Sequence, residues 1–117
     1  MKTILLVEDD PSIQDALRLI FNTPEFCLIV CDNAEEIFLK NMQIPDIYLV
    51  DKQLSGRNGL ELCRFLKTNE KTKSIPVIML SAAPNIRQLA EEAGADDAIE
   101  KPFKISQLQE KIFLALS

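Results

Sequence analysis

Short apolar runs alternate with amphipathic segments along nearly the whole chain, and this alternation restricts the fold more than any other feature of the sequence. The runs occupy residues 4–7, 27–31, 47–50, 77–80 and 98–99. Between them, apolar side chains recur at spacings of three and four within residues 13–20, 34–38, 62–66, 86–93 and 105–112. This spacing gives a helix one apolar face. The sequence therefore predicts five strand–helix units.

The apolar runs do not alternate with polar residues, which is typical of parallel strands covered on both faces. Right-handed crossovers between such strands produce an α/β, doubly wound fold. Ligands of these folds bind at the carboxyl ends of the strands. Functional residues are therefore expected directly after the apolar runs.

Residues that favour helix ends agree with this division. Asp10, followed by a proline, is expected to cap the first helix. Asp32 with Glu35 resembles a capping box for the second. Pro84 is expected to open the fourth helix and Gly94 to close it.

Composition narrows the class of protein. The 117 residues suffice for one compact domain, and 13 basic against 18 acidic residues give a net charge of −5. Because the basic residues are scattered, we expect no direct binding of nucleic acid. No apolar run is long enough for a membrane span or a signal peptide, so we expect a cytoplasmic protein that does not bind membranes. Cys27, Cys31 and Cys63 are expected to be buried free thiols, which fits a reducing compartment.

Carboxylates gather at two predicted strand ends. Glu8 and Asp9 follow the first run, and Asp51 ends the third. If these strands are neighbours, the three carboxylates converge and repel one another unless a cation neutralises them. The sequence has no histidine, and oxygen ligands alone favour a hard cation, Mg²⁺, Mn²⁺ or Ca²⁺.

Two further polar residues are predicted at the same rim. Ser81 ends the fourth run and Lys101 the fifth. A lysine can bind a phosphate, and a serine hydroxyl can donate to a phosphoryl oxygen. An aspartate can act as a covalent nucleophile toward phosphorus. Together these residues indicate phosphoryl chemistry at Asp51.

Four segments carry a family resemblance. ILLVEDD (4–10), LVD…GRNG (49–59), MLSA (79–82) and GADDAIEKPF (94–103) resemble, in order and spacing, the receiver domain of two-component response regulators. The resemblance covers essentially the whole chain. It implies a flavodoxin-like sandwich with a five-stranded parallel sheet in the order 2-1-3-4-5. We accordingly expect residues 1–117 to form a single receiver domain.

The resemblance also implies a metal site. It assigns Asp9 as the main acidic ligand of Mg²⁺, with Mn²⁺ as a substitute, and Glu8 as its partner through water. Asp51 is a ligand too, and the backbone carbonyl of Gln53 completes the protein's share of the coordination.

The remaining roles follow the family as well. Asp51 is the expected phosphoacceptor, Ser81 the hydroxyl residue, and Lys101 the site lysine, with a cis bond before Pro102. The expected phosphodonor is a histidine kinase or a histidine phosphotransfer protein, and the output passes to a downstream protein. Such a domain promotes only its own phosphorylation and dephosphorylation, so we expect no enzyme with a separate substrate. A monomer or weak homodimer is expected.

Several residues depart from the family pattern. Ala98 stands where receiver domains usually carry Tyr or Phe. In the family that aromatic ring couples phosphorylation to the surface formed by the fourth helix, the fifth strand and the fifth helix, so this output switch is in doubt here. Lys52 replaces the usual apolar residue after the phosphoacceptor; we favour a solvent-facing side chain over one that controls access to Asp51. Gln53 and Ala83 occupy positions that set the lifetime of the phosphoryl group, and we predict slow to intermediate hydrolysis.

Simpler roles are expected for other polar and glycine residues. Asp10 is a helix cap rather than a metal ligand. Asp96 and Asp97 are expected to be solvated loop residues. Gly56 and Gly59 are expected to shape the turn after the third strand.

Three other functions remain as alternatives. A phosphohydrolase of the haloacid dehalogenase kind needs a second aspartate where this chain has Gln53. A flavodoxin-like cofactor binder needs a Ser, Thr and Gly-rich loop where this chain has acidic residues. A phosphate-independent interaction domain on a receiver scaffold is compatible with Ala98, but Asp9, Asp51 and Lys101 argue against it.

Overall fold

The computed structural model describes residues 1–39, 43–54 and 57–117. A five-stranded parallel sheet forms its centre, in the order β2-β1-β3-β6-β7. These strands are β1 (Lys2–Val7), β2 (Phe26–Cys31), β3 (Ile47–Asp51), β6 (Val77–Ser81) and β7 (Asp97–Glu100). Numbered among themselves, they stand in the order 2-1-3-4-5, so the predicted α/β fold and strand order are confirmed.

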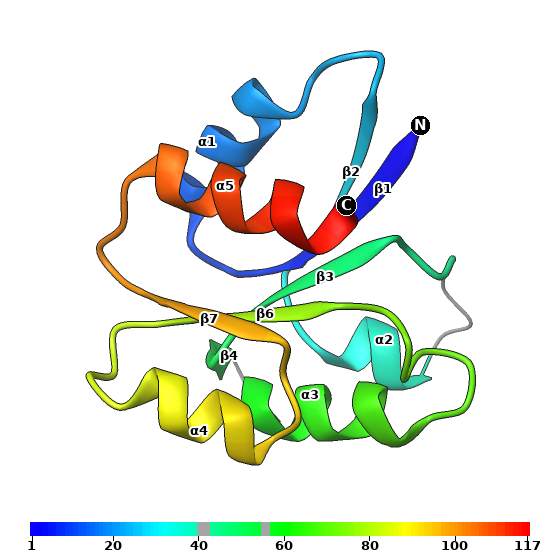
Figure 1. The fold of residues 1–117 in the computed structure, drawn as a ribbon, viewed down its shortest axis with the longest axis vertical. Coiled ribbons are helices and arrows are strands. Elements are labelled where there is room, and N and C mark those ends of the chain that lie inside the picture. The colour runs from blue at the N-terminus through cyan, green and yellow to red at the C-terminus, as the bar shows by residue number, and fades with distance from the viewer. Residues whose placement is uncertain (40–42, 55–56) are drawn as a thin grey trace.

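Helices cover both faces of this sheet, as Figure 1 shows. α1 (Pro11–Ile20) and α5 (Ile105–Leu116) lie on one face. α2 (Glu35–Leu39), α3 (Gly59–Thr68) and α4 (Ile86–Glu92) lie on the other. A second, two-stranded antiparallel pair joins β4 (Gln53–Leu54) to β5 (Arg57–Asn58). The sequence patterns did not predict this β4–β5 pair.

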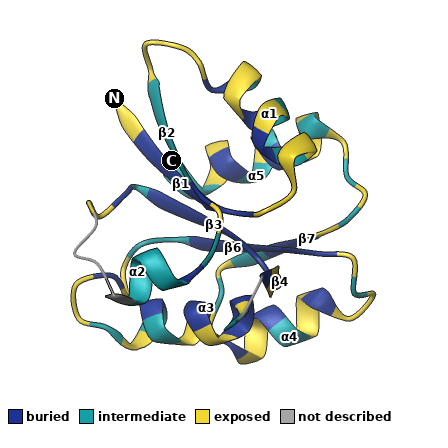
Figure 2. Ribbon diagram, turned by 180° about the vertical axis from the view of Figure 1, so that it is seen from behind, coloured by how far each residue is buried: buried dark blue, intermediate teal, exposed yellow. Residues whose placement is uncertain are grey.

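Alternate side chains of each central strand enter two separate cores. Leu49 packs in the core under α1 and α5, whereas Val50 packs in the core under α2, α3 and α4. All five residues of β3 are buried, and Figure 2 shows the central strands as the most buried part of the ribbon. β2 is mostly half-buried because it lies at the edge of the sheet. Continuous apolar runs are thus explained by cover on both faces.

The helix ends confirm some of the predicted caps and correct others. The Asp10 carboxylate accepts a hydrogen bond from Ser12 N at 2.9 Å and caps α1, as predicted. The predicted capping box of α2 is wrong, since Asn33 Oδ1, not Asp32, accepts from Glu35 N at 3.0 Å. α4 begins at Ile86, two residues after Pro84. Gly94 follows α4 with a φ of 87°, a conformation that glycine adopts without steric cost.

The two aspartates before and in β7 carry structural roles that the sequence did not indicate. Asp96 is exposed, as expected, but its Oδ2 accepts from Val77 N at 2.8 Å and from Lys67 Nζ at 2.9 Å. Asp97 is half-buried in β7 and pairs with Lys111 Nζ at 3.1 Å. The prediction of a solvated loop residue is therefore wrong for Asp97 and incomplete for Asp96.

All three cysteines are thiols rather than parts of a disulfide, as expected. Cys31 and Cys63 are buried, whereas Cys27 on the edge strand is half-buried. None of the helices in the described ranges has the length and apolar character that crossing a membrane requires.

Candidate metal and phosphoryl site

Strand pairing brings the predicted site residues to one edge of the sheet. Val7 of β1 is in register with Val50 of β3, so the next residues, Glu8 and Asp51, emerge side by side. Ser81 is the last residue of β6, and its carbonyl accepts a hydrogen bond from Lys101 N at 2.7 Å. The carboxyl ends of four strands thus supply one cluster of polar side chains.

Three carboxylates form the acidic part of this cluster. Oxygen atoms of Glu8, Asp9 and Asp51 all lie within 4.8 Å of one another. Glu8 is fully buried, Asp51 is 5% exposed, and Asp9 faces solvent. Such a set of carboxylate oxygens, open to solvent at one ligand, matches the donor preference of Mg²⁺ or Mn²⁺. The residues therefore fit the metal that the sequence predicts.

Lys101 completes the cluster from the segment after β7. Its Nζ lies 2.7 Å from Glu8 Oε1 and 3.2 Å from Asp51 Oδ1. The peptide bond between Lys101 and Pro102 is cis, as the resemblance implied. One ammonium group thus bridges the buried glutamate and the predicted phosphoacceptor.

The charges of the cluster affect its titration. Burial raises the pKa of Glu8 from its ordinary value of 4.5 to about 7; the hydrogen bond from Lys101 opposes this rise and Asp51 adds to it. For Lys101, burial alone would lower the pKa, but Glu8 and Asp51 together raise it above 10.5. Lys101 therefore stays protonated, and Glu8 changes charge near neutral pH.

Gln14 of α1 holds the backbone at Glu8 and also contacts Asp32, although the sequence patterns did not single it out. Its Nε2 donates to the carbonyl oxygen of Glu8 at 2.6 Å and to Asp32 Oδ1 at 2.8 Å. Gln14 is 7% exposed. A buried polar residue on the apolar face of an amphipathic helix is the signal that could have indicated this contact.

Backbone hydrogen bonds hold the segment after Asp51 in place. Gly59 N donates to the carbonyl oxygen of Lys52 at 2.7 Å, and Lys52 N donates to Leu80 O at 2.8 Å. A Cβ at Gly59 would overlap the carbonyl oxygen of Asp51. Gly59 therefore serves the predicted turn by permitting this close approach, whereas Gly56 lies outside the described residues.

The other predicted residues lie around the rim. Ser81 is buried, and its Oγ accepts a hydrogen bond from Ala83 N at 3.0 Å. Gln53 is exposed at the start of β4, and Lys52 is half-buried. Ala98 is buried in β7, and beside it a pocket of about 340 Å³ is lined in part by Ala90 and Ala95.

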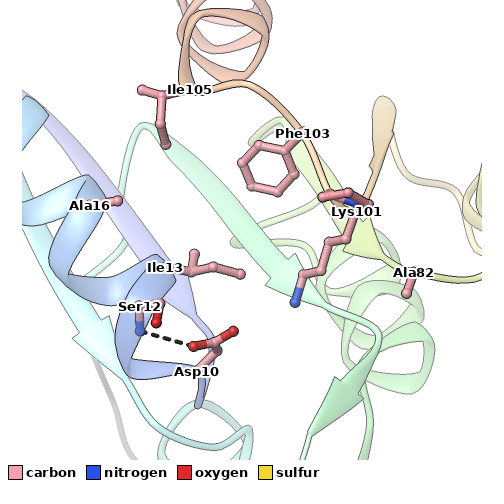
Figure 3. Close-up of a pocket in the computed structure, with 9 residues that line it drawn as sticks. Asp10, Ser12, Ile13, Ala16, Ala82, Lys101, Phe103 and Ile105 are labelled. Atoms are coloured by element: carbon pink, nitrogen blue, oxygen red, sulfur yellow. Dashed lines mark hydrogen bonds between the residues drawn. The ribbon is translucent and has the colours of Figure 1, made fainter.

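A pocket of about 450 Å³ opens next to the cluster, between α1 and the segment that leads into α5. Figure 3 shows Ile13 and Phe103 facing each other across it, with the ammonium group of Lys101 directed toward the end of β3. Asp10, hydrogen-bonded to Ser12, lies at its rim. The site therefore adjoins an apolar depression large enough for side chains of another molecule.

Comparisons with known proteins agree with this arrangement. The profile of the response regulator receiver domain matches residues 4–113. The DNA-binding response regulator MtrA of Mycolicibacterium smegmatis is 32% identical over 112 residues, which are 93% of this chain and 48% of that protein. The chain thus spans about half the length of such curated relatives.

Solved structures show the same architecture. A response regulator from Chloroflexus aurantiacus has a TM-score of 0.87 at 28% identity, covering 98% of this chain and 97% of that one. The receiver domain of the sensor histidine kinase PA1611 from Pseudomonas aeruginosa has a TM-score of 0.84 at 25% identity, with 98% and 97% covered. That structure holds a magnesium ion coordinated in its active site cleft.

Proposed function

Because this chain belongs to the family of response regulator receiver domains, we propose that Asp51 accepts a phosphoryl group in a reaction that requires Mg²⁺. The observation that carries this proposal is the position of the Asp51 carboxylate. It is almost buried, 3.2 Å from Lys101 Nζ, and one of three carboxylates whose oxygens lie within 4.8 Å of one another. Residues 1–117 would act as the receiver domain.

The residues that would hold the metal are Asp9, Asp51 and the backbone carbonyl of Gln53, with Glu8 contributing through water. Mn²⁺, which prefers the same oxygen donors, would substitute. When bound, the metal supplies positive charge that stabilises the phosphoryl oxygens during in-line transfer.

The transfer itself is a displacement at phosphorus. An oxygen of Asp51 forms the new bond, the phosphorus–nitrogen bond of a phosphohistidine donor breaks, and its electron pair stays on the nitrogen. Lys101, protonated because Glu8 and Asp51 raise its pKa, donates to a phosphoryl oxygen. Ser81 uses its oxygen to accept from Ala83 N, so its O–H can donate to another. The domain would promote only its own phosphorylation and dephosphorylation, and would not be an enzyme with a separate substrate.

The donor would be a histidine kinase or a histidine phosphotransfer protein. The pocket between Ile13 and Phe103 (Figure 3) lies beside the cluster, and apolar side chains of the donor could pack there while its phosphohistidine reaches Asp51. Direct contact with nucleic acid is not part of the proposal, since the chain is acidic overall. DNA binding, as named for MtrA, would come from another domain. The output of the receiver domain itself would be a contact with a downstream protein.

Phosphorylation by small donors tests the proposal. The protein is incubated with acetyl phosphate or phosphoramidate, with Mg²⁺ or with EDTA, and its intact mass is measured. We expect an added phosphoryl mass that needs Mg²⁺ and disappears in Asp51→Ala. Asp15→Asn, which changes an exposed aspartate of α1, should be modified like the wild type. Modification that persists in Asp51→Ala would refute Asp51 as the phosphoacceptor. A wild-type protein that shows no Mg²⁺-dependent modification would refute the proposal and favour the phosphate-independent alternative.

A further inference from the structure

Arg57 connects the segment after Asp51 to the helices beneath it. Its Nε lies 2.5 Å from Glu35 Oε1 at the start of α2. The guanidinium carbon lies 4.4 Å from the ring centre of Phe38, also in α2. The Phe38 ring in turn lies 4.8 Å from the ring of Phe65 in α3. One arginine side chain therefore contacts α2 through charge and through an aromatic face that packs on α3.

The backbone of Arg57 belongs to the β4–β5 pair that carries Gln53. Leu54 is in register with Arg57, and Gln53 with Asn58. Leu54 is buried. A shift of Arg57 therefore moves the strand against which Gln53 is held.

The β4–β5 pair needs support from outside. Each of its strands has two residues, and an isolated two-stranded pair is marginally stable in water. The chain after it is fixed, since Asn58 Oδ1 accepts from Leu60 N at 2.8 Å and Gly59 N donates to Lys52 O at 2.7 Å. The contacts of Arg57 with Glu35 and Phe38 attach β5 to α2.

These contacts are strong enough to place a short segment but not to determine the fold. The side chains of Arg57 and Glu35 are 36% and 43% exposed, and such ion pairs contribute little to global stability. Mg²⁺, however, demands near-ideal octahedral geometry. A small displacement of one ligand therefore weakens metal binding more than it weakens the fold.

We propose that Arg57 is a positioning residue of the metal site, which holds the backbone carbonyl of Gln53 in place by anchoring the β4–β5 pair to Glu35 and Phe38. This inference rests on the proposed function, because it concerns a ligand assigned there. It adds a residue that does not itself touch the metal.

Calorimetric Mg²⁺ titration of the metal-free protein tests the proposal, with thermal unfolding measured in EDTA on the same samples. Arg57→Met keeps an apolar contact with Phe38 but removes the charge, and Arg57→Lys keeps the charge. Glu35→Gln removes the ion pair while Arg57 stays. Arg18→Met is the matched control, because Arg18 pairs with Asp15 on the surface of α1. Asp9→Asn reports on the metal site itself.

We expect Arg57→Met to raise the Mg²⁺ dissociation constant about five-fold, the effect of a change of about 1 kcal/mol. Glu35→Gln should have a smaller effect in the same direction, Arg57→Lys should restore part of the affinity, and Arg18→Met should leave it unchanged.

Wild-type affinity in Arg57→Met, together with lost binding in Asp9→Asn, would overturn the role of Arg57 and leave the proposed function standing. A lower unfolding temperature with unchanged affinity would also overturn it, because that is the signature of a purely structural contact. A wild-type protein that binds no Mg²⁺ would overturn both proposals.

Discussion

The ammonium nitrogen of Lys101 lies 2.7 Å from a carboxylate oxygen of Glu8, although the two residues are 93 positions apart in the chain. The contact links the segments that follow β1 and β7 at the carboxyl ends of the strands. Burial nevertheless raises the pKa of Glu8 to about 7 despite this ion pair. The buried glutamate therefore favours its neutral form more in the folded protein than in the unfolded chain.

This shift predicts that Glu8 makes the metal-free protein less stable as the pH rises. The folded-state pKa of about 7 lies above the ordinary value of 4.5, so the folded state binds the proton more tightly than the unfolded state. The contribution of Glu8 is fully present below about pH 4.5 and is lost as the pH rises through about 7. In Glu8→Gln, the free energy of unfolding should fall less between these pH values than in the wild type. Urea unfolding in EDTA across the pH range measures this difference.

Magnesium provides the internal control for that experiment. If Glu8 takes part in the metal site, Mg²⁺ should stabilise the protein more at high pH than at low pH, because metal and proton compete for the carboxylate. The same pH slope for wild type and Glu8→Gln in EDTA would contradict the assignment of the raised pKa to Glu8.

A side chain at Gly59 should damage both the fold and the site. In Gly59→Ala the new Cβ would overlap the carbonyl oxygen of Asp51, and backbone cannot move aside as a flexible side chain can. We expect a loss of about 1–3 kcal/mol in the free energy of unfolding, with weaker Mg²⁺ binding because Asp51 is displaced. Denaturant unfolding and Mg²⁺ titration measure the two effects.

Gly94→Ala is the matched control for this substitution. Gly94 has a φ of 87°. A Cβ there would first meet Lys67 Cβ at 3.4 Å and no atom of Asp51. The left-handed conformation should cost Gly94→Ala about 1–2 kcal/mol of stability, with unchanged Mg²⁺ affinity. Equal effects of both substitutions on Mg²⁺ binding would show that general destabilisation is the cause.

The sequence predicted the parts of the site that depend on strand ends. Asp51 and Ser81 end continuous apolar runs, and burial on both faces makes such runs recognisable as central parallel strands. Because β1 and β3 are neighbouring parallel strands, Glu8 and Asp51 meet at their carboxyl ends. Local periodicity thus predicted the strands and helices, whereas the strand order that brings the carboxylates together was what the family resemblance implied.

Residues that act through contacts distant in sequence could not be predicted in this way. Arg57, for example, meets Glu35 across 22 positions. The strands β4 and β5 are two residues long, too short to show a period. Their positions depend on tertiary packing, which leaves no local pattern in the sequence.

Asp96 illustrates the same point and gives a further prediction. Its carboxylate joins Lys67 of α3 to the backbone N–H of Val77 at the start of β6. Asp96→Ala would leave that N–H without this acceptor, and we expect a loss of about 1–2 kcal/mol in the free energy of unfolding. Asp96→Asn, which keeps an acceptor oxygen, should lose less. Glu70→Gln serves as the comparison, because the Glu70–Lys73 pair is largely exposed and should contribute little; equal losses in Asp96→Ala and Glu70→Gln would contradict the role of Asp96.

The lifetime of the phosphorylated protein should depend on Gln53. Gln53 is exposed at the start of β4, two residues after Asp51, and its side-chain amide can orient a water molecule for attack on the phosphoryl group. Ala83, two residues after Ser81, offers no such group. We therefore expect slow to intermediate hydrolysis in the wild type and slower hydrolysis in Gln53→Ala, measured as the decay of the phosphoryl mass after the donor is removed. The backbone carbonyl of Gln53 is retained in this variant, so Mg²⁺ affinity should stay unchanged and serves as the control. A decay rate equal to that of the wild type would exclude a role for the Gln53 side chain in positioning water.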